Sequence, residues 1–284
     1  MSVANGFNRM EGEAAAVLRR CAANVMTALN LLARPARSRL SRSDAYSLPM
    51  LAVAVGVAIA VFLFLAWTLD AAASRAAGRV PRWIIDLFDD ITDFGKSGWF
   101  LWPLGLLFLA LAALPPVLTP FSQRVLAAVM VRVGFLFTAI AVPSLFVTIV
   151  KRIIGRARPN VGGSLDPFLF SPLKWHAAYA AMPSGHSTTA FAVLVAFGTL
   201  WPRARTALLI YAVLIAISRV VVTAHYPTDV LAGALVGAAG AMMVRRYFAL
   251  RRLGFSIGPG GNVHQLPGPS LRRIKAVARN LLAP

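Results

Sequence analysis

Acidic residues are scarce in this chain, and cysteine is almost absent. Only 10 of the 284 residues are Asp or Glu, against 29 Lys or Arg, and charged residues together make up 14% of the sequence. Soluble domains carry roughly a quarter charged residues, so this composition excludes an ordinary soluble globular protein. The single cysteine, Cys21, excludes an intrachain disulfide and leaves the redox compartment undetermined.

Long apolar runs take the place of the missing charge. Hydrophobic residues make up 58% of the sequence and are concentrated in blocks. A helix needs roughly 20 apolar residues to cross the hydrocarbon of a bilayer. We therefore predict an all-α fold, a polytopic membrane helical bundle with six transmembrane helices. The expected spans are about 47–69, 99–119, 127–150, 186–202, 205–223 and 228–249.

These spans divide the chain into three parts. Residues 1–46 form a basic N-terminal tail, residues 47–250 the six-span domain, and residues 251–284 a basic C-terminal tail. Residues 256–270 are rich in Gly and Pro and predict a flexible linker. Residues 271–282 fit two alternatives, a short helix lying on an anionic leaflet or a disordered basic tail.

The basic residues are distributed unevenly between the two sides of the membrane. With six spans both tails lie on one side, which carries 18 Lys and Arg against 10 on the other, while Arg132 lies within a span. The positive-inside rule then places the termini in the cytoplasm of a bacterial inner (cytoplasmic) membrane. The excess charge is explained by orientation and by contact with membrane lipids, so no nucleic-acid partner is expected.

Two glycines, Gly233 and Gly237, form a GxxxG pair in the last predicted span. This spacing indicates close helix packing within the bundle and is a weak signal for a dimer. The sequence leaves the oligomeric state open.

Three polar motifs lie near the ends of the predicted spans: KRIIGRARP (151–159), PSGH (183–186) and SRVVVTAHYPTD (218–229). Ionisable residues at membrane depth are costly and usually mark a functional site. The predicted topology places all three motifs on the outer face. We expect them to meet in one site that faces the periplasm or exterior.

The residue types in these motifs suit a phosphate group. Lys151 and Arg158 are seven residues apart, which returns nearly to the same helix face, and Arg219 adds a third cation. Clustered cations favour an anion, and guanidinium groups bind phosphate in a bidentate manner. Ser184 and Gly185 add a hydroxyl, room for close backbone approach and a helix N-terminus.

Two histidines flank this expected anion site. Asp229 follows His225 by four residues, so it can hold one ring nitrogen and leave the other free to attack, while His186 stands on the PSGH motif. Arg152 and Arg156 are interpreted as side chains that snorkel to headgroups.

Together the motifs resemble the type 2 phosphatidic acid phosphatase superfamily, whose pattern is K-x6-RP, then PSGH, then SR-x5-H-x3-D. Every motif position matches, and the resemblance covers about residues 100–250. It implies an integral membrane hydrolase that acts on a lipid phosphate or diphosphate through a phosphohistidine. The resemblance assigns His225 as the nucleophile, Asp229 as the residue that orients it, and His186 as the acid and later the base. Lys151, Arg158, Arg219, Ser184 and the Gly185 amide would hold the phosphoryl oxygens.

Several alternatives stay open. The first alternative is a lipid phosphotransferase with the same site. The second is an anion transporter or scaffold, in which the cations bind an anion without catalysis. The candidate substrates are undecaprenyl diphosphate, phosphatidic acid, phosphatidylglycerol phosphate and lipid A.

No metal or other cofactor is expected, because the aspartates of the first outer loop are interpreted as a solvated face. They are Asp70, Asp86, Asp89, Asp90 and Asp93. Residues 82–99 predict an interfacial helix beside the mouth of the site. His176 and His264 are interpreted as loop residues without a catalytic role.

Overall fold

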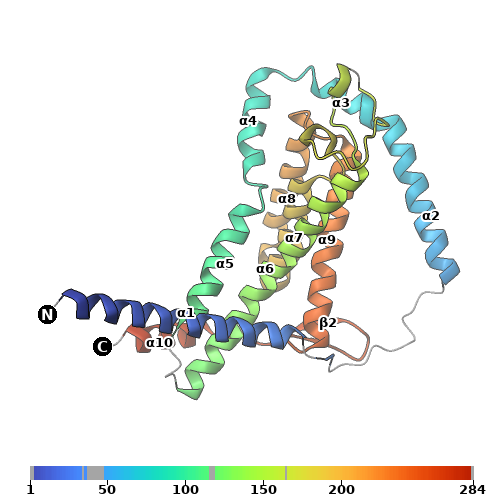
Figure 1. The fold of residues 1–284 in the computed structure, drawn as a ribbon. Coiled ribbons are helices and arrows are strands. Elements are labelled where there is room, and N and C mark those ends of the chain that lie inside the picture. The colour runs from blue at the N-terminus through green and yellow to red at the C-terminus, as the bar shows by residue number, and fades with distance from the viewer. Residues whose placement is uncertain (1–2, 34, 37–47, 115–118, 164, 283–284) are drawn as a thin grey trace. The chain divides into compact units, whose positions relative to one another are not determined.

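Helices make up most of the computed structural model, which describes residues 3–33, 35–36, 48–114, 119–163 and 165–282 (Figure 1). The longer helices are α1 (Val3–Ala33), α2 (Leu48–Leu65), α5 (Gly98–Ala113), α6 (Pro120–Ile154), α7 (Gly185–Leu200), α8 (Arg205–Val221) and α9 (Pro227–Leu250). The shorter ones are α3 (Ala71–Ala77), α4 (Arg82–Asp93) and α10 (Leu271–Leu282).

Five ranges within the described residues are long and apolar enough to cross a membrane. They are Val55–Ala77, Arg82–Ala113, Pro120–Ile154, Pro202–Val221 and Pro227–Leu250. The predicted span at 186–202 corresponds to α7, which is apolar but has only 16 residues. At 1.5 Å per residue it extends about 24 Å, against a hydrocarbon core of about 30 Å. The helical membrane class is confirmed, and the count of six spans stays a prediction.

The first predicted span differs from the structure at its C-terminal end. We expected it to end at residue 69, with Asp70 in an outer loop. Instead α2 runs through a π-helical segment, Ala66–Asp70, directly into α3. Asp70 therefore lies in continuous helix. The expected start of this span at residue 47 lies outside the described residues.

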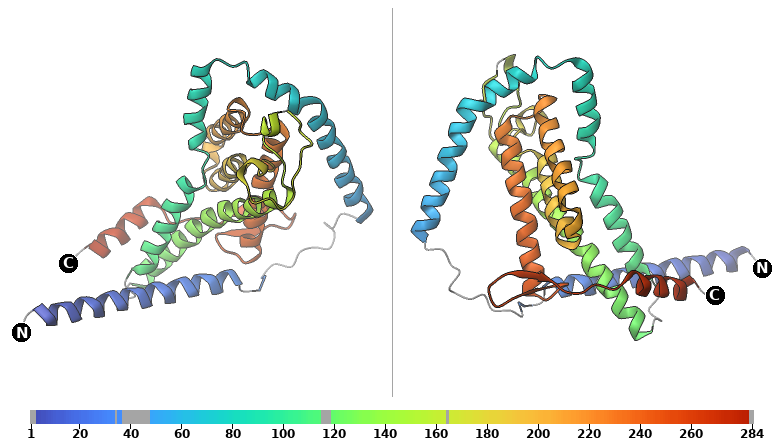
Figure 2. Two further views of the ribbon diagram at one scale, coloured as in Figure 1. Left: turned by 45° about the horizontal axis from the view of Figure 1, so that its top comes forward. Right: turned by 180° about the vertical axis from the view of Figure 1, so that it is seen from behind.

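The chain forms two compact units. One comprises residues 40–101 and 138–245, and we call it the site unit because it contains all three polar motifs. Within it α7, α8 and the adjoining parts of α6 and α9 lie side by side (Figures 1 and 2). A Cβ on Gly233 would lie 2.4 Å from the carbonyl oxygen of Ser184, and one on Gly237 would lie 2.2 Å from that of Thr188. The GxxxG pair therefore packs α9 against α7, as the sequence predicts.

The turn after α6 is fixed by backbone hydrogen bonds to the following loop. The amide of Ala157 donates to Leu169 O (2.9 Å), and that of Ser171 donates to Gly155 O (2.7 Å). Gly155 has φ +64°, and a Cβ there would lie 2.0 Å from Ser171 O, so only glycine fits. This turn sets the direction in which the residues after α6 enter the site.

The second unit comprises residues 1–39, 102–137 and 246–284. The ring of Phe135 packs edge-on against Phe255 at a centroid distance of 4.7 Å. Strand β1 (Phe255–Ile257) pairs antiparallel with β2 (Val263–Gln265). The predicted flexible linker is therefore wrong over this hairpin, because Phe255 is a buried anchor and Gly and Asn residues supply a turn between the strands.

The structure decides between the two alternatives that the sequence leaves for the C-terminal residues. Residues 271–282 form the helix α10 rather than a disordered tail. Val277 is buried, whereas Leu271 is exposed on the same helix.

Candidate active site

The PSGH motif ends at the first turn of α7. Ser184 immediately precedes this helix and is completely buried. Its backbone amide donates to the carbonyl oxygen of Asp229 at 2.9 Å. One hydrogen bond thus joins the PSGH motif to the first turn of α9, where the third motif ends.

Three cations lie at the C-terminal ends of α6 and α8. Lys151 lies in the last turn of α6, Arg158 lies just beyond that helix, and Arg219 lies in the last turn of α8. Arg158 is an electrostatic neighbour of both Lys151 and Arg219. The Nε atoms of Arg158 and Arg219 are buried and have no hydrogen-bond partner among the described residues. Because buried donors are normally satisfied, these groups are suited to the oxygens of a phosphoryl group.

The C-terminal end of α4 contacts the same site. Thr92 is buried, and its hydroxyl oxygen accepts hydrogen bonds from Arg219 Nη1 (2.6 Å) and Ser218 Oγ (3.0 Å). A Cβ on Gly95 would lie 3.0 Å from His186 Cδ2. The helix predicted over residues 82–99 is shorter in the structure, where α4 ends at Asp93 and α5 begins at Gly98. Its position at the membrane interface stays a prediction, and its C-terminal end contacts residues of the polar motifs directly.

His225 and Asp229 lie close together at the turn between α8 and α9. His225 is only 4% exposed, and its Nδ1 lies 3.7 Å from Asp229 Oδ2. That separation is longer than a hydrogen bond, so the carboxylate acts on the imidazole here as a nearby negative charge. The same Oδ2 accepts a hydrogen bond from the amide of Tyr226 at 2.9 Å, which holds the carboxylate beside the imidazole.

Burial is the main influence on the protonation of His225. It lowers the pKa of the imidazole below the ordinary value, while the negative charge of Asp229 opposes the shift. Arg219 and Arg158 add to the lowering by repelling a proton. The ring is therefore held in its neutral form, which has a nitrogen lone pair available for attack.

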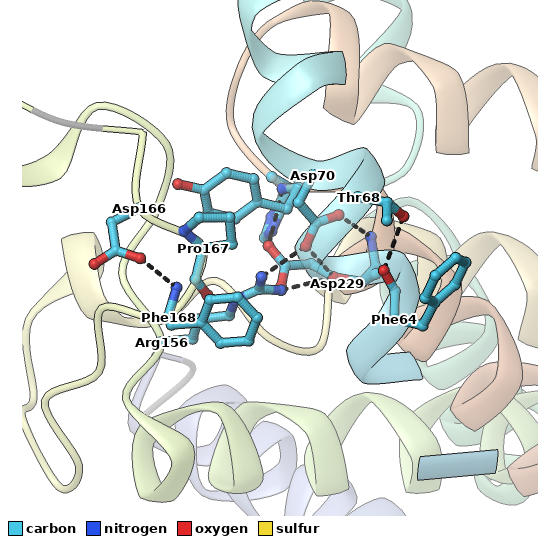
Figure 3. Close-up of polar contacts among 11 residues, drawn as sticks. Phe64, Thr68, Asp70, Arg156, Asp166, Pro167, Phe168 and Asp229 are labelled. Atoms are coloured by element: carbon cyan, nitrogen blue, oxygen red, sulfur yellow. Dashed lines mark hydrogen bonds and ion pairs between the residues drawn. The ribbon is translucent and has the colours of Figure 1, made fainter. Parts of the chain in front are cut away.

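Arg156 is the main correction to the sequence analysis. Its side chain does not snorkel, because the residue is 1% exposed and its guanidinium lies between two carboxylates (Figure 3). Nη1 donates to Asp229 Oδ1 at 2.5 Å, and Nη2 donates to Asp70 Oδ2 at 2.7 Å. Nε donates to the carbonyl oxygen of Pro167 at 2.9 Å, so each nitrogen has a partner.

Asp70 is the second residue that the sequence analysis misplaced. It is 0% exposed, and its carboxylate accepts hydrogen bonds from the backbone amide of Thr228 (3.0 Å) and from the Thr228 hydroxyl. The one available signal was a carboxylate at the end of an otherwise apolar run, which is costly in a membrane unless it is paired.

The eight predicted site residues all belong to the site unit, and the contacts above connect their elements. The two remaining histidines do not join them. His176 Nδ1 accepts a hydrogen bond from the amide of Ala178, and His264 lies on β2 in the other unit. Within the described ranges, no group of three or more His, Cys, Asp or Glu side chains is arranged to hold a metal ion.

Comparisons with known proteins find several that are similar to this chain. Residues 132–253 match the PAP2 superfamily. A lipid A 1-phosphatase from Rhizobium johnstonii is 36% identical over 190 residues, which cover 66% of this chain and 78% of that protein. A lipid A 1-phosphatase from Rhizobium etli is 35% identical over 190 residues, with coverages of 66% and 82%. The crystal structure of a PAP2-type phosphatidylglycerolphosphate phosphatase from Bacillus subtilis aligns with a TM-score of 0.46 and 24% identity, over 66% of this chain and 91% of that chain.

Proposed function

This chain belongs to the PAP2 superfamily and is an integral membrane lipid phosphatase, and on that premise we propose that it removes the 1-phosphate of lipid A through a phosphohistidine on His225. The proposal is carried by one observation. The buried imidazole of His225 lies 3.7 Å from Asp229 and within the electrostatic reach of Arg158 and Arg219. The relatives named as lipid A 1-phosphatases support the choice of lipid.

The reaction proceeds in two displacements at phosphorus. In the first, Nε2 of His225 attacks, an N–P bond forms, and the P–O bond to the lipid breaks. The leaving oxygen takes the electron pair of that bond and a proton from His186. In the second, His186 removes a proton from water, the water oxygen attacks phosphorus, and the electron pair of the N–P bond returns to the ring. A positioned acid and base contribute about 10²–10⁴-fold to such a reaction.

The cations supply the rest of the catalysis. A phosphoryl-transfer transition state spreads negative charge over three oxygens, so it needs positioning and neutralisation more than covalent help. Lys151, Arg158 and Arg219 fill that role, and Ser184 and the Gly185 amide bind a further oxygen at the N-terminus of α7.

This set of groups makes a divalent metal unnecessary. Asp70 and Asp229 already bind Arg156, so neither carboxylate is free for Mg²⁺. We expect turnover to persist in excess chelator and to be inhibited by vanadate, which occupies the phosphoryl site. Complete loss in chelator with recovery on adding a divalent metal contradicts this mechanism.

We place the protein in a bacterial inner membrane with cytoplasmic termini and a site that faces the periplasm or exterior. The asymmetry of Lys and Arg supports this orientation. A site on the outer face would meet its lipid in the outer leaflet of that membrane.

The substrate is tested with the purified protein in detergent against a panel of lipids. The panel contains lipid A carrying the 1-phosphate, phosphatidylglycerol phosphate, phosphatidic acid and undecaprenyl diphosphate. We expect the highest kcat/KM for lipid A, with mass spectrometry showing loss of the 1-phosphate. A higher value for another lipid reassigns the substrate and leaves the phosphatase standing.

The same samples test the rival functions. A phosphotransferase transfers the phosphate to a second lipid instead of releasing it, which product analysis detects. A transporter or scaffold releases phosphate no faster than the background.

A further inference from the structure

A buried ion-pair chain lies behind the proposed nucleophile. Arg156 donates to Asp70 on one side and to Asp229 on the other, and all three side chains are at most 2% exposed (Figure 3). A buried guanidinium that serves two carboxylates at once is demanding to build, because each charge must be compensated. The assignments above give Asp229 the role of orienting His225 and give the other two residues no role in catalysis.

Asp70 also fixes the start of α9. Its carboxylate accepts the backbone amide of Thr228, which is the second residue of that helix. The first amides of a helix have no partner within the helix and favour a negative charge. Asp70 therefore caps α9 from a different part of the chain, and Asp229 lies in the turn that it caps.

The aromatic ring of Tyr226 packs against the guanidinium of Arg156. The ring centroid lies 4.7 Å from Cζ of Arg156, and Tyr226 is completely buried. The amide of the same residue holds Asp229 Oδ2. Both oxygens of Asp229 are thus fixed, one by Arg156 and one by this amide.

The charges of Asp70, Arg156 and Asp229 do not cancel. Two carboxylates against one guanidinium leave one surplus negative charge beside His225. When the phosphoryl group bonds to Nε2 while Nδ1 keeps its proton, the ring becomes cationic and compensates that surplus. At low dielectric such a match is worth far more than in water.

We propose that Asp70 and Arg156 are positioning residues of this enzyme, which fix the Asp229 carboxylate and give the buried cluster the surplus negative charge that stabilises the phosphorylated imidazole of His225. The inference rests on the proposed function of His225. Neither residue touches the substrate. Both act through Asp229 and through the charge of the cluster.

The test uses the dependence of kcat/KM on pH, because charge acts on it with a predictable sign. The charged or titratable groups that face His225 are Asp229, Arg219, Arg158 and His186. Replacing Asp70 by Asn removes a negative charge, disfavours the protonated ring, and moves the acidic limb to lower pH. Replacing Arg156 by Gln removes a positive charge and moves the limb to higher pH. The double variant keeps one net negative charge in the cluster, as the wild-type protein does. The acidic limb of its kcat/KM profile should therefore return close to the wild-type position.

The kinetic constants give a second measure. Asp70→Asn should lower kcat by about 10- to 100-fold, as loss of a supporting partner commonly does. KM should change less than about twofold, because the phosphate-binding cations are unaltered. Thr228→Val removes a hydroxyl but no charge, so it should leave the acidic limb in place. Asp86→Asn is the matched control, because this aspartate is exposed.

Melting of each detergent-purified variant shows whether it is folded. If Arg156→Gln does not fold, the comparison of Asp70→Asn with Thr228→Val decides the question. The inference is overturned if the acidic limb of kcat/KM stays in place in both single variants. It is also overturned if the limb moves in the same direction in both. His225→Ala separates this outcome from failure of the proposed function. Turnover that persists without His225 overturns both, whereas His225-dependent turnover with Asp70→Asn behaving like Asp86→Asn overturns the inference alone.

Discussion

Burial controls the chemistry of individual residues in this site. His225 is almost completely enclosed, and its ring is kept neutral although a carboxylate lies 3.7 Å from Nδ1. The negative charge of Asp229 opposes the effect of burial on the pKa of the ring, whereas the positive charges of Arg219 and Arg158 reinforce it. A nucleophile of this kind needs no separate base to remove a proton before it attacks.

This environment predicts how activity depends on pH. Burial lowers the pKa of His225 below its ordinary value of 6.5, so the neutral ring persists into more acidic solution. We therefore expect the acidic limb of kcat/KM, after correction for the titration of the substrate phosphate, to lie below pH 6.5. The measurement is a pH profile from 4 to 9 in detergent. A corrected limb above the ordinary value contradicts the assignment of this limb to a buried imidazole.

The site residues were predictable from sequence to different extents. The spacing of His225 and Asp229 predicts that they act together, and the resemblance of the motifs to a known family implies the role of His186. Arg156 lies in the KRIIGRARP motif, but its partner Asp70 is 86 residues away in the sequence. Span-end arginines usually reach to headgroups, so only the tertiary structure shows that this one is buried.

At the scale of elements, contact between α7 and α9 sets the geometry of the site. The carbonyl oxygen of Ser184 lies against Gly233, and the amide of Ser184 binds the carbonyl of Asp229. The glycine is needed here because the two helix backbones approach more closely than a Cβ allows. The close packing of α9 against the start of α7 therefore also fixes the position of Ser184, the serine that we propose binds phosphate.

Gly233→Ala tests this requirement. The added methyl would lie 2.4 Å from Ser184 O, so the helices must separate and the PSGH motif must shift. Such overpacking commonly destabilises by about 1–3 kcal/mol, and we expect a lower melting temperature together with a lower kcat. Gly56→Ala is the matched control, because a Cβ there meets nothing within 4 Å. Equal behaviour of the two variants contradicts the proposed role of the contact.

The elements themselves were predicted unevenly. Long apolar runs gave most of the spanning helices, because hydropathy reports burial in lipid directly. The end of the first span was misplaced, since Asp70 resembles a loop residue until its partners are known. The hairpin over 255–265 was missed because its anchor is one buried aromatic contact with Phe135, which local composition does not reveal.

At the scale of the whole molecule, the orientation in the membrane determines which leaflet supplies the substrate. The tails and short loops on one predicted side carry most of the Lys and Arg. Membrane insertion retains such residues in the cytoplasm. The site would then open on the opposite side.

Thiol labelling tests this orientation. In a Cys21→Ser background, Asp90→Cys places a single exposed thiol on α4. We expect an impermeant maleimide to label it in intact spheroplasts. Labelling that requires lysis would reverse the topology and move the substrate to the inner leaflet.

The central claim is that phosphate leaves the lipid through a covalent bond to His225. The direct measurement is acid-quenched trapping, after brief reaction of the purified protein with lipid A labelled by ³²P at the 1-phosphate. Controls for folding are the melting temperature and elution volume of each variant. The account predicts an acid-labile, base-stable label on the wild-type protein, and neither label nor phosphate release above background with folded His225→Ala. Near-normal phosphate release by His225→Ala would contradict it.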